Sequence, residues 1–274
     1  MASIHEAVRD RYRQAAMRDA KDSSDDRSCC SGSDSCCGSE DAAGQSTRFG
    51  YTIEELKLLP EGADLGLGCG NPTALAALSA GEVVVDLGSG AGIDCFLAAR
   101  RVGDSGRVIG VDMTPEMVER ARANAERAGF TNVEFRLGEI AHLPIADGSV
   151  DVIISNCVVN LAPEKNRVLT DALRVLKHGG RISISDLVLE REPPAEIRAN
   201  IALLTGCIAG AMVKREFLSA LEQAGFVDVK IDAESPYLKL EHLASLAAEA
   251  GISEDGAARI AENVRSITVS GRKA

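Results

Sequence analysis

The sequence predicts an α/β fold, in which helices cover both faces of a seven-stranded, mostly parallel sheet that ends in an antiparallel strand. Short apolar runs alternate with helical segments from residue 82 onward, a pattern typical of parallel sheets. The run at 82–87 is apolar almost throughout, as expected for a strand covered on both faces. The final run, SITVSGRK, suits an antiparallel hairpin that closes such a sheet.

The expected elements follow one another in a regular order. Strands are expected at residues 82–87, 107–112, 132–137, 150–155, 180–186, 226–232 and 265–272. Helices are expected at residues 3–20, 54–59, 73–78, 91–101, 115–128, 164–177 and 214–224, with two more helical stretches before the last strand. The helix at 115–128 has the clearest limits, because Thr114 suits an N-cap, Pro115 the first helical position and Gly129 the residue past the end.

Composition divides the chain into two parts. Residues 1–46 are predicted to form a helix and then a flexible arm rich in Ser, Asp and Gly, which cannot bury enough apolar area to order itself. Residues 47–274 form the expected α/β domain, with insertions at 60–72 and 190–212 that we expect to cap a substrate. The arm also carries two Cys-Cys pairs, which a plain linker does not need.

Charge and composition exclude several classes of partner. The formal net charge is −11, Trp is absent and aromatic residues make up 3% of the chain, which argues against nucleic acid or an anionic membrane as a ligand. The first residues, MASIHEAVRDRYRQAA, are charged and lack the apolar region of a signal peptide. The longest uncharged apolar run, 199–213, is too short to span a bilayer comfortably. We therefore expect a cytoplasmic protein, and in that compartment cysteines are more often catalytic, metal-binding or redox-active than structural. We also expect the protein to be a monomer.

A Gly-rich turn follows the first predicted strand, in the stretch VVVDLGSGAGIDCF. Such a turn between a strand and a helix lets the backbone approach a ligand closely, and the start of the helix offers N–H groups. Gly88 and Gly90 are followed by Ile93 where a dinucleotide-binding fingerprint has its third Gly. Asp86 before them completes a D-x-G-x-G pattern, which resembles that of class I methyltransferases using S-adenosylmethionine, with their Rossmann-like fold.

This resemblance implies where the methyl donor binds. Asp112, at the end of the second strand, is placed to accept hydrogen bonds from the ribose hydroxyls, and Glu139 with Ile140 is expected near the adenine. The end of the fourth strand should face the methyl group, because ligands of such sheets bind at the carboxyl ends of the strands. The expected donor-binding residues are Tyr51, Asp86, Gly88, Gly90, Asp112, Met113, Glu139, Ile140 and Asn156. Taken singly, Asp86 and Asp112 are also explained as solvated carboxylates at strand ends.

Cys157 and Cys207 stand where such a fold builds its substrate pocket, and Cys69 lies in a Gly-flanked loop that can fold over it. The stretches GADLGLGCGNP, ISNCVVNLAPEK and TGCIAGA, which contain these cysteines, resemble bacterial arsenite S-adenosylmethionine methyltransferases; the likeness runs from about residue 51 to about residue 231. The resemblance implies that Cys69, Cys157 and Cys207 gather around trivalent arsenic. It also implies a redox role for an N-terminal cysteine, and the form Cys-Cys-Gly favours Cys37 or Cys36.

The chemistry of arsenic agrees with such a site. Trivalent arsenic is soft, and thiolate is the soft ligand that a protein offers. Three thiolates leave the arsenic lone pair as the nucleophile, so no base is needed, and none of the four His is an obvious candidate for one. We expect methylation of arsenite or methylarsenite for arsenic detoxification, with S-adenosylmethionine as donor and a thiol reductant such as thioredoxin or glutathione.

Plainer explanations exist for the cysteines and for the whole chain. Cys95, on the helix after the Gly-rich turn, is expected to pack as a small apolar residue. The pairs Cys29–Cys30 and Cys36–Cys37 suit a soft-metal scavenging arm, a redox partner for Cys69 or a zinc site. The alternative functions are methylation of a carbon or oxygen nucleophile, such as a quinone precursor, and thiol-metal binding without catalysis.

Overall fold

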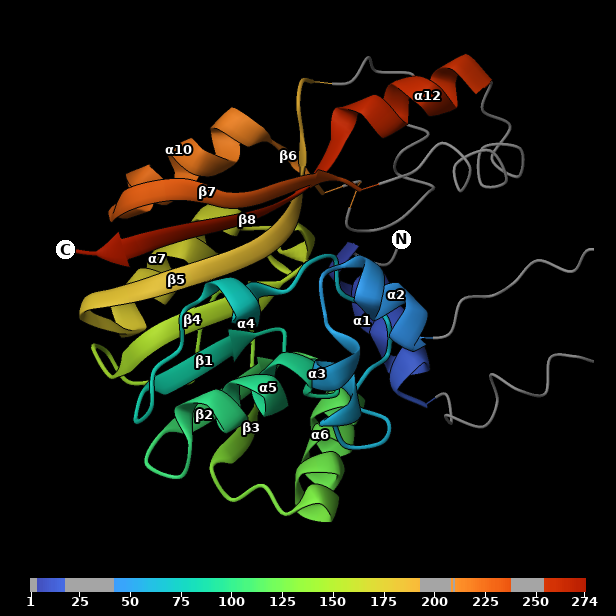
Figure 1. Ribbon diagram of the computed structural model, residues 1–274. Coiled ribbons are helices and arrows are strands. Elements are labelled where there is room, and N and C mark those ends of the chain that lie inside the picture. The colour runs from blue at the N-terminus through green and yellow to red at the C-terminus, as the bar shows by residue number, and fades with distance from the viewer. Residues whose placement is uncertain (1–3, 18–41, 193–207, 209, 238–253) are drawn as a thin grey trace, which may run out of the picture.

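An eight-stranded sheet runs through the middle of the molecule (Figure 1). The structure is a computed structural model that describes residues 4–17, 42–192, 208, 210–237 and 254–274. The strands stand in the order β3-β2-β1-β4-β5-β8-β7, and β6 pairs with β5. Their bounds are Val83–Leu87 (β1), Arg107–Asp112 (β2), Val133–Leu137 (β3), Val150–Asn156 (β4), Leu176–Leu189 (β5), Met212–Val213 (β6), Phe226–Pro236 (β7) and Val264–Lys273 (β8). The predicted fold is confirmed; the additional strand, β6, has two residues and is too short to show a periodicity.

The strand pairing determines where a ligand can bind. β1 pairs in parallel with both β2 and β4, and β4 pairs in parallel with β5. β8 runs antiparallel to β5 and β7, as the sequence predicts. The chain builds β2 and β3 on one side of β1 and then continues with β4 on the other side. Such a reversal of strand order opens a crevice at the carboxyl ends of the strands, between β1 and β4.

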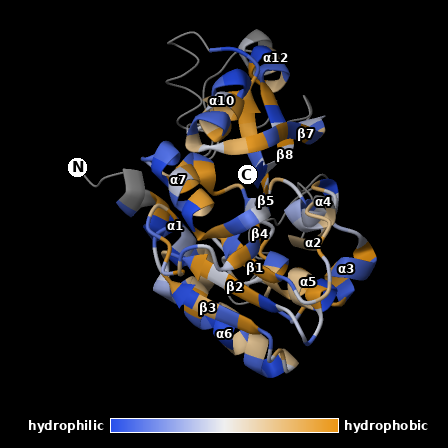
Figure 2. Ribbon diagram, turned by 90° about the vertical axis from the view of Figure 1, so that its left-hand side faces the viewer, coloured by the Kyte–Doolittle hydropathy of each residue, from blue (hydrophilic) through white to orange (hydrophobic). Residues whose placement is uncertain are grey.

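Helices cover the sheet on both faces, and each face has its own apolar core. The helices are Ile4–Met17 (α1), Ala42–Arg48 (α2), Ile53–Lys57 (α3), Pro72–Leu75 (α4), Ile93–Val102 (α5), Pro115–Ala128 (α6), Lys165–Val175 (α7), Lys214–Ala224 (α10) and Glu254–Asn263 (α12), with a 3₁₀ turn at Val159–Leu161 (η2). Val84 of β1 belongs to the core under α5 and α6, whereas Val85 and Leu87 belong to the opposite core with α7 and α10. Figure 2 shows the hydrophobic residues concentrated on the central strands and the inward sides of the helices. This alternation along β1 explains its continuous apolar sequence.

The N-terminal boundary differs from the prediction. Helix α2 occupies part of the segment that was expected to be a flexible arm up to residue 46. Its Ser46 is buried, and the Ser46 hydroxyl donates a hydrogen bond of 2.7 Å to the Asp64 carboxylate. Tertiary contacts therefore order a stretch whose composition predicts disorder. The remainder of the arm, at 18–41, lies outside the described residues.

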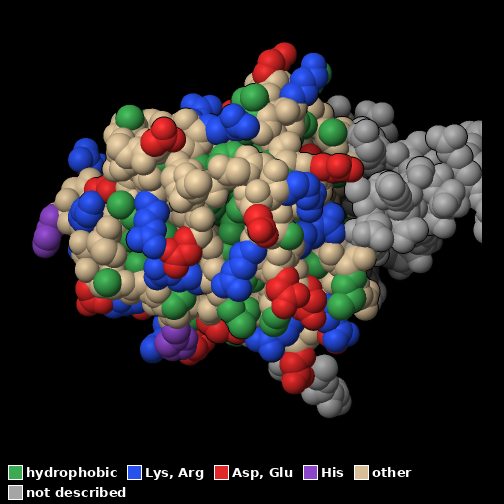
Figure 3. All heavy atoms as spheres, turned by 90° about the horizontal axis from the view of Figure 1, so that it is seen from below, with side chains coloured by type: hydrophobic (Ala, Val, Ile, Leu, Met, Phe, Trp, Pro, Cys, Tyr) green, Lys and Arg blue, Asp and Glu red, His purple; other side chains and the backbone are tan. Residues whose placement is uncertain are grey.

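Charges of both signs are mixed on the surface. In the view of Figure 3, Lys and Arg side chains lie among Asp and Glu side chains, and hydrophobic residues are scattered between them. This face lacks the continuous basic stripe that is typical of nucleic-acid binding. Among the helices of the described ranges, none is both long enough and apolar enough to cross a bilayer.

Candidate active site

A cavity of about 410 Å³ opens at the carboxyl ends of β1, β2 and β4. This volume is typical of small-molecule sites. Every residue that the sequence predicts to bind the donor lines the cavity, namely Tyr51, Asp86, Gly88, Gly90, Asp112, Met113, Glu139, Ile140 and Asn156. The structure thus brings the predicted set together, and what each residue contacts in a bound ligand stays a prediction.

Hydrogen bonds to the Asp112 carboxylate connect the Gly-rich turn to the end of β2. One carboxylate oxygen accepts the backbone N–H of Gly90 at 2.9 Å, and the other accepts that of Thr114 at 2.8 Å. Gly90 has a φ of +51°, and nothing lies within 4 Å of the place where a Cβ would stand. The buried hydroxyl of Ser89 has no hydrogen-bond partner among the described residues. The turn therefore leaves open space and an unused polar group beside the Asp112 carboxylate.

Replacing Gly88 with Ala is expected to destabilise the fold more than replacing Gly129 with Ala. The two glycines have φ values of +69° and +71°, so each alanine should cost about 1–2 kcal/mol of backbone strain. An alanine Cβ at Gly88 would lie 2.4 Å from Val158 Cγ2, whereas nothing lies within 4 Å of a Cβ at Gly129. The clash should add roughly 1–3 kcal/mol at Gly88 alone. Denaturant titrations measure both losses, and equal losses would show that the turn has room to relax.

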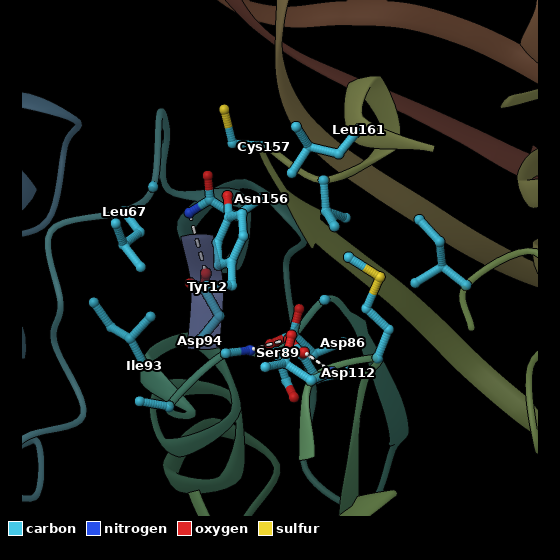
Figure 4. Close-up of a pocket in the computed structure, with 18 of the residues that line it drawn as sticks. Tyr12, Leu67, Asp86, Ser89, Ile93, Asp94, Asp112, Asn156, Cys157 and Leu161 are labelled. Carbon is cyan, nitrogen blue, oxygen red and sulfur yellow. Dashed lines mark hydrogen bonds between the residues drawn. The ribbon is translucent and has the colours of Figure 1, made fainter. Parts of the chain in front are cut away.

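A buried hydrogen-bond network centred on Asp94 joins the pocket to the loop that carries Cys69. The Asp94 carboxylate, in the first turn of α5, accepts bonds of 2.9 Å from the hydroxyls of Tyr51 and Thr73. The Asn156 amide nitrogen donates to Asp94 at 3.2 Å and to the Tyr51 hydroxyl at 2.8 Å, and Figure 4 shows the first of these bonds. The Asn156 amide oxygen accepts the backbone N–H of Cys69 at 3.0 Å. Asn156 therefore ties the Cys69 loop to the pocket.

The pocket is acidic. Burial raises the pKa of Asp86 well above its ordinary value, and the nearby Asp94 carboxylate raises it further. Burial also raises the pKa of Asp94 and of Asp112, although the N–H groups of Thr114 and Gly90 partly offset the effect at Asp112. None of the described residues that line the pocket is Lys or Arg. A positively charged ligand would therefore relieve the repulsion between these carboxyl groups.

The Cys69 and Cys157 sulfurs lie close together, and Cys157 lines the pocket at the end away from the Gly-rich turn. Figure 4 shows Cys157 at one end and Asp86, Ser89 and Asp112 at the other. The Sγ atoms of Cys69 and Cys157 lie within 4.8 Å of each other. The two residues are 1% and 3% exposed, so both thiol groups are shielded from bulk water.

The backbone is unusual at Cys157 and closely packed at Cys69. Cys157 has a φ of +58°, a left-handed conformation that is uncommon outside glycine and often marks a functional site. The carbonyl oxygen of Cys69 accepts a hydrogen bond of 2.6 Å from Ser266 of β8. A Cβ at Gly68 would lie 2.8 Å from the Asn156 amide nitrogen, and one at Gly70 would lie 2.6 Å from Ser185 Cβ. The glycines beside Cys69 thus let its loop press against the strand ends.

The other predicted cysteines have different outcomes. Cys95 is fully buried as expected, and its thiol also donates a 3.3 Å hydrogen bond to Asp86, which the packing prediction did not include. Burial raises the pKa of Cys95 well above its ordinary value, so this thiol stays protonated. Cys207 and Cys37 lie outside the described residues. Ile208, next to Cys207, is buried in one apolar cluster with Cys69 and Cys157.

Some pocket residues were missed by the sequence analysis. Tyr12 lines the cavity from α1, and Leu67 lines it from the loop before Cys69. Asp94 could have been found, since an acidic residue in the first turn after a Gly-rich loop points back toward the ligand. His142 also lines the pocket, but it is exposed, which agrees with the prediction that it is no obvious catalytic base. Tyr12 has no such signal, because its place depends on how α1 packs.

The comparisons with known proteins agree with this geometry. A family model described as a methyltransferase domain matches residues 78–225. An arsenic(III) S-adenosylmethionine methyltransferase from Chlamydomonas reinhardtii has a solved structure that is 34% identical, with a TM-score of 0.65, and the match covers 82% of this chain and 71% of that one. The chain belongs to the arsenic(III) S-adenosylmethionine methyltransferase family.

Two curated relatives are described as arsenite methyltransferases. The arsenite methyltransferase of Halobacterium salinarum is 53% identical over 226 residues, which are 82% of this chain and 58% of the relative. That of Aquipseudomonas alcaligenes is 44% identical over 184 residues, 65% of this chain and 53% of the relative. The chain therefore spans about half the length of the curated family members that it matches.

Proposed function

We propose that the chain transfers methyl groups from S-adenosylmethionine to trivalent arsenic held by the thiolates of Cys69, Cys157 and Cys207. The proposal is carried by the two buried sulfurs, which lie within 4.8 Å of each other, and by Cys157, which lines an acidic pocket. Paired thiolates are the ligands that soft arsenic prefers. The burial of Ile208 beside both cysteines supports Cys207 as the third ligand. The names of the relatives, arsenite methyltransferases, support the same substrate.

The residues of the pocket fit S-adenosylmethionine. The donor carries a sulfonium and an ammonium group, and the pocket presents Asp86, Asp94 and Asp112 without Lys or Arg among its described lining residues. The open side of Gly90 and the unused Ser89 hydroxyl leave room and a polar contact beside Asp112. When bound, S-adenosylmethionine supplies an electrophilic methyl group on its sulfonium sulfur.

The protein contributes alignment and exclusion of water. The Asn156 amide fixes the Cys69 loop, and Cys157 follows Asn156 directly, so one strand end positions the backbone of both cysteines. With the donor bound, the arsenic lone pair would form the new bond to the methyl carbon, and the electrons of the broken carbon–sulfur bond would remain on the sulfur, which becomes a neutral thioether. No proton has to be removed from the nucleophile, which agrees with the absence of a buried His from the described lining of the pocket.

Turnover requires two electrons after each transfer, since the methylated arsenic is formally pentavalent. We propose that Cys69 and a cysteine of the N-terminal arm supply them by closing a disulfide, which reduces the arsenic back to the trivalent state. A cytosolic thiol reductant, such as thioredoxin or glutathione, then reopens the disulfide. Cys36 and Cys37, which lie outside the described residues, are the proposed arm partners.

The test of the function is arsenic speciation after incubation of the full chain with arsenite, S-adenosylmethionine and a thiol reductant. Methylated arsenic should accumulate with time and with donor concentration. The matched control omits the donor, so arsenite bound by thiols alone is not counted as product. If arsenite is bound but no methylated arsenic forms, the protein is a thiol-metal binder and the catalytic proposal is wrong.

Double replacement of Cys36 and Cys37 with Ser is expected to slow methylation of arsenite more than double replacement of Cys29 and Cys30. Deleting the whole arm would be a poorer test, because Tyr12 of α1 lines the pocket. Both double variants keep α1, so donor binding should not change. Time courses of methylated arsenic give the rates of both variants. In the unsubstituted protein, mass mapping after one turnover without reductant should find a disulfide between Cys69 and a cysteine of the arm. If both variants methylate arsenite at the full rate and no such disulfide forms, the proposed redox role of the arm cysteines is wrong.

A further inference from the structure

A buried carboxylate lies beside the thiol pair. Asp186, on β5, is fully buried, and one of its oxygens lies within 4.8 Å of both Cys69 Sγ and Cys157 Sγ. Neither the donor pocket nor the proposed arsenic site uses this carboxylate. Trivalent arsenic bound by thiolates has no need of a hard oxygen ligand.

Hydrogen bonds hold the Asp186 carboxylate in place. One oxygen accepts the Asn160 amide at 2.8 Å and the backbone N–H of Leu187 at 2.8 Å. The other oxygen accepts the backbone N–H of Asn160 at 3.1 Å. Each carboxylate oxygen has two lone pairs, so the second oxygen keeps one for another partner. Outer hydrogen bonds of this kind orient carboxylates that bind metals.

Two thiolates and one carboxylate form a donor set for a borderline divalent cation. Zn²⁺ takes Cys sulfur and Asp oxygen together, usually with four ligands, and the fourth place is open to water or a further thiolate. The half-buried Lys165 attracts Asp186 electrostatically and would balance part of the charge of the three ligands. We propose that Cys69, Cys157 and Asp186 bind Zn²⁺ or Cd²⁺, and that the bound cation blocks methylation by occupying the arsenic thiols. The blocking role rests on the proposed function; the cation site does not.

The site is tested with Cd²⁺, whose bonds to thiolate absorb in the ultraviolet. The four arm cysteines, Cys29, Cys30, Cys36 and Cys37, are first replaced with Ser, so their thiols do not contribute. This protein should bind one Cd²⁺ with charge-transfer absorbance. Adding Asp186→Asn should weaken binding at least roughly 10-fold, because a direct ligand is lost and the loss of an outer hydrogen-bond partner alone costs roughly 10–100-fold. Arsenite binding by Asp186→Asn, measured by mass spectrometry, should be nearly unchanged.

A second measurement identifies the ligands of the bound cation directly. The X-ray absorption spectrum of the Zn²⁺-loaded, arm-substituted protein should show sulfur neighbours together with at least one oxygen neighbour. The oxygen contribution should be smaller in the spectrum of the Asp186→Asn protein, where water is the remaining source of oxygen at the site. Equal Cd²⁺ affinity with and without Asp186, or a shell of sulfur alone, would overturn the proposal. Cd²⁺ binding that depends on Asp186 in a protein that fails to bind arsenite would leave the cation site standing and reject the proposed function instead.

Discussion

Replacing Cys157 with Ser is expected to abolish arsenite binding and methyl transfer while leaving donor binding intact. A serine hydroxyl is a hard and poorly ionised ligand, so the arsenic would lose a strong bond. The affinity for arsenite should fall by more than roughly 100-fold, because removing only an outer hydrogen-bond partner already lowers the affinity of a metal site by roughly 10–100-fold. Arsenite binding is measured by mass spectrometry, donor binding by calorimetry and activity by speciation of arsenic.

Cys95→Ser is the matched control for this change. Cys95 is as deeply buried as Cys157, and its thiol donates a hydrogen bond to Asp86 that a serine hydroxyl can also donate. Methylation should therefore be nearly normal in this variant. Normal activity of Cys157→Ser would remove Cys157 from the site. A folded but inactive Cys95→Ser would show that Cys95 does more than pack against Asp86.

Replacing Asp112 with Ala is expected to weaken S-adenosylmethionine binding while arsenite binding stays nearly normal. Hydrogen bonds to a charged group are worth roughly 1.5–3 kcal/mol, which corresponds to an increase of roughly 10- to 150-fold in Kd. The carboxylate also holds the N–H groups of Gly90 and Thr114, so the shape of the turn contributes to the effect. Calorimetry with S-adenosylmethionine gives the change in affinity.

The control for Asp112 is Asp104→Ala. Asp104 is exposed in the connection between α5 and β2 and does not line the pocket, so its loss removes one negative charge without touching the turn. Donor affinity should be unchanged in the control. An unchanged affinity in Asp112→Ala as well would contradict the placement of the donor at the end of β2.

Local patterns in the sequence predict the fold and the outline of the site, because both depend on short-range order. The apolar run of β1 and the turn after it fix the position of Gly88 and Gly90, and the strand ends place Asp112 and Asn156 at one edge of the sheet. The family resemblance adds Cys69, which no strand pattern could place. In the structure this loop reaches the ends of β4 and β8 through Asn156 and Ser266.

The contacts that the sequence could not predict join residues far apart in the chain. Asp94 lies 43 residues from Tyr51 and 62 from Asn156, so their network appears only when the sheet is assembled. Asp186 lies in the buried carboxyl-terminal half of β5, and its nearness to the two sulfurs depends on how the Cys69 loop folds back. Helix α2 has a composition typical of a linker, and its buried Ser46 contacts Asp64, 18 residues further along the chain.

The X-ray absorption spectrum of arsenic bound to the protein tests the central claim most directly. The arm-substituted protein is loaded with arsenite, and the neighbours of the arsenic are read from the arsenic edge. The proposed site predicts sulfur neighbours from Cys69, Cys157 and Cys207, with no oxygen neighbour. An arsenic shell of oxygen, or a sulfur shell that is unchanged in the Cys157→Ser variant, would contradict it.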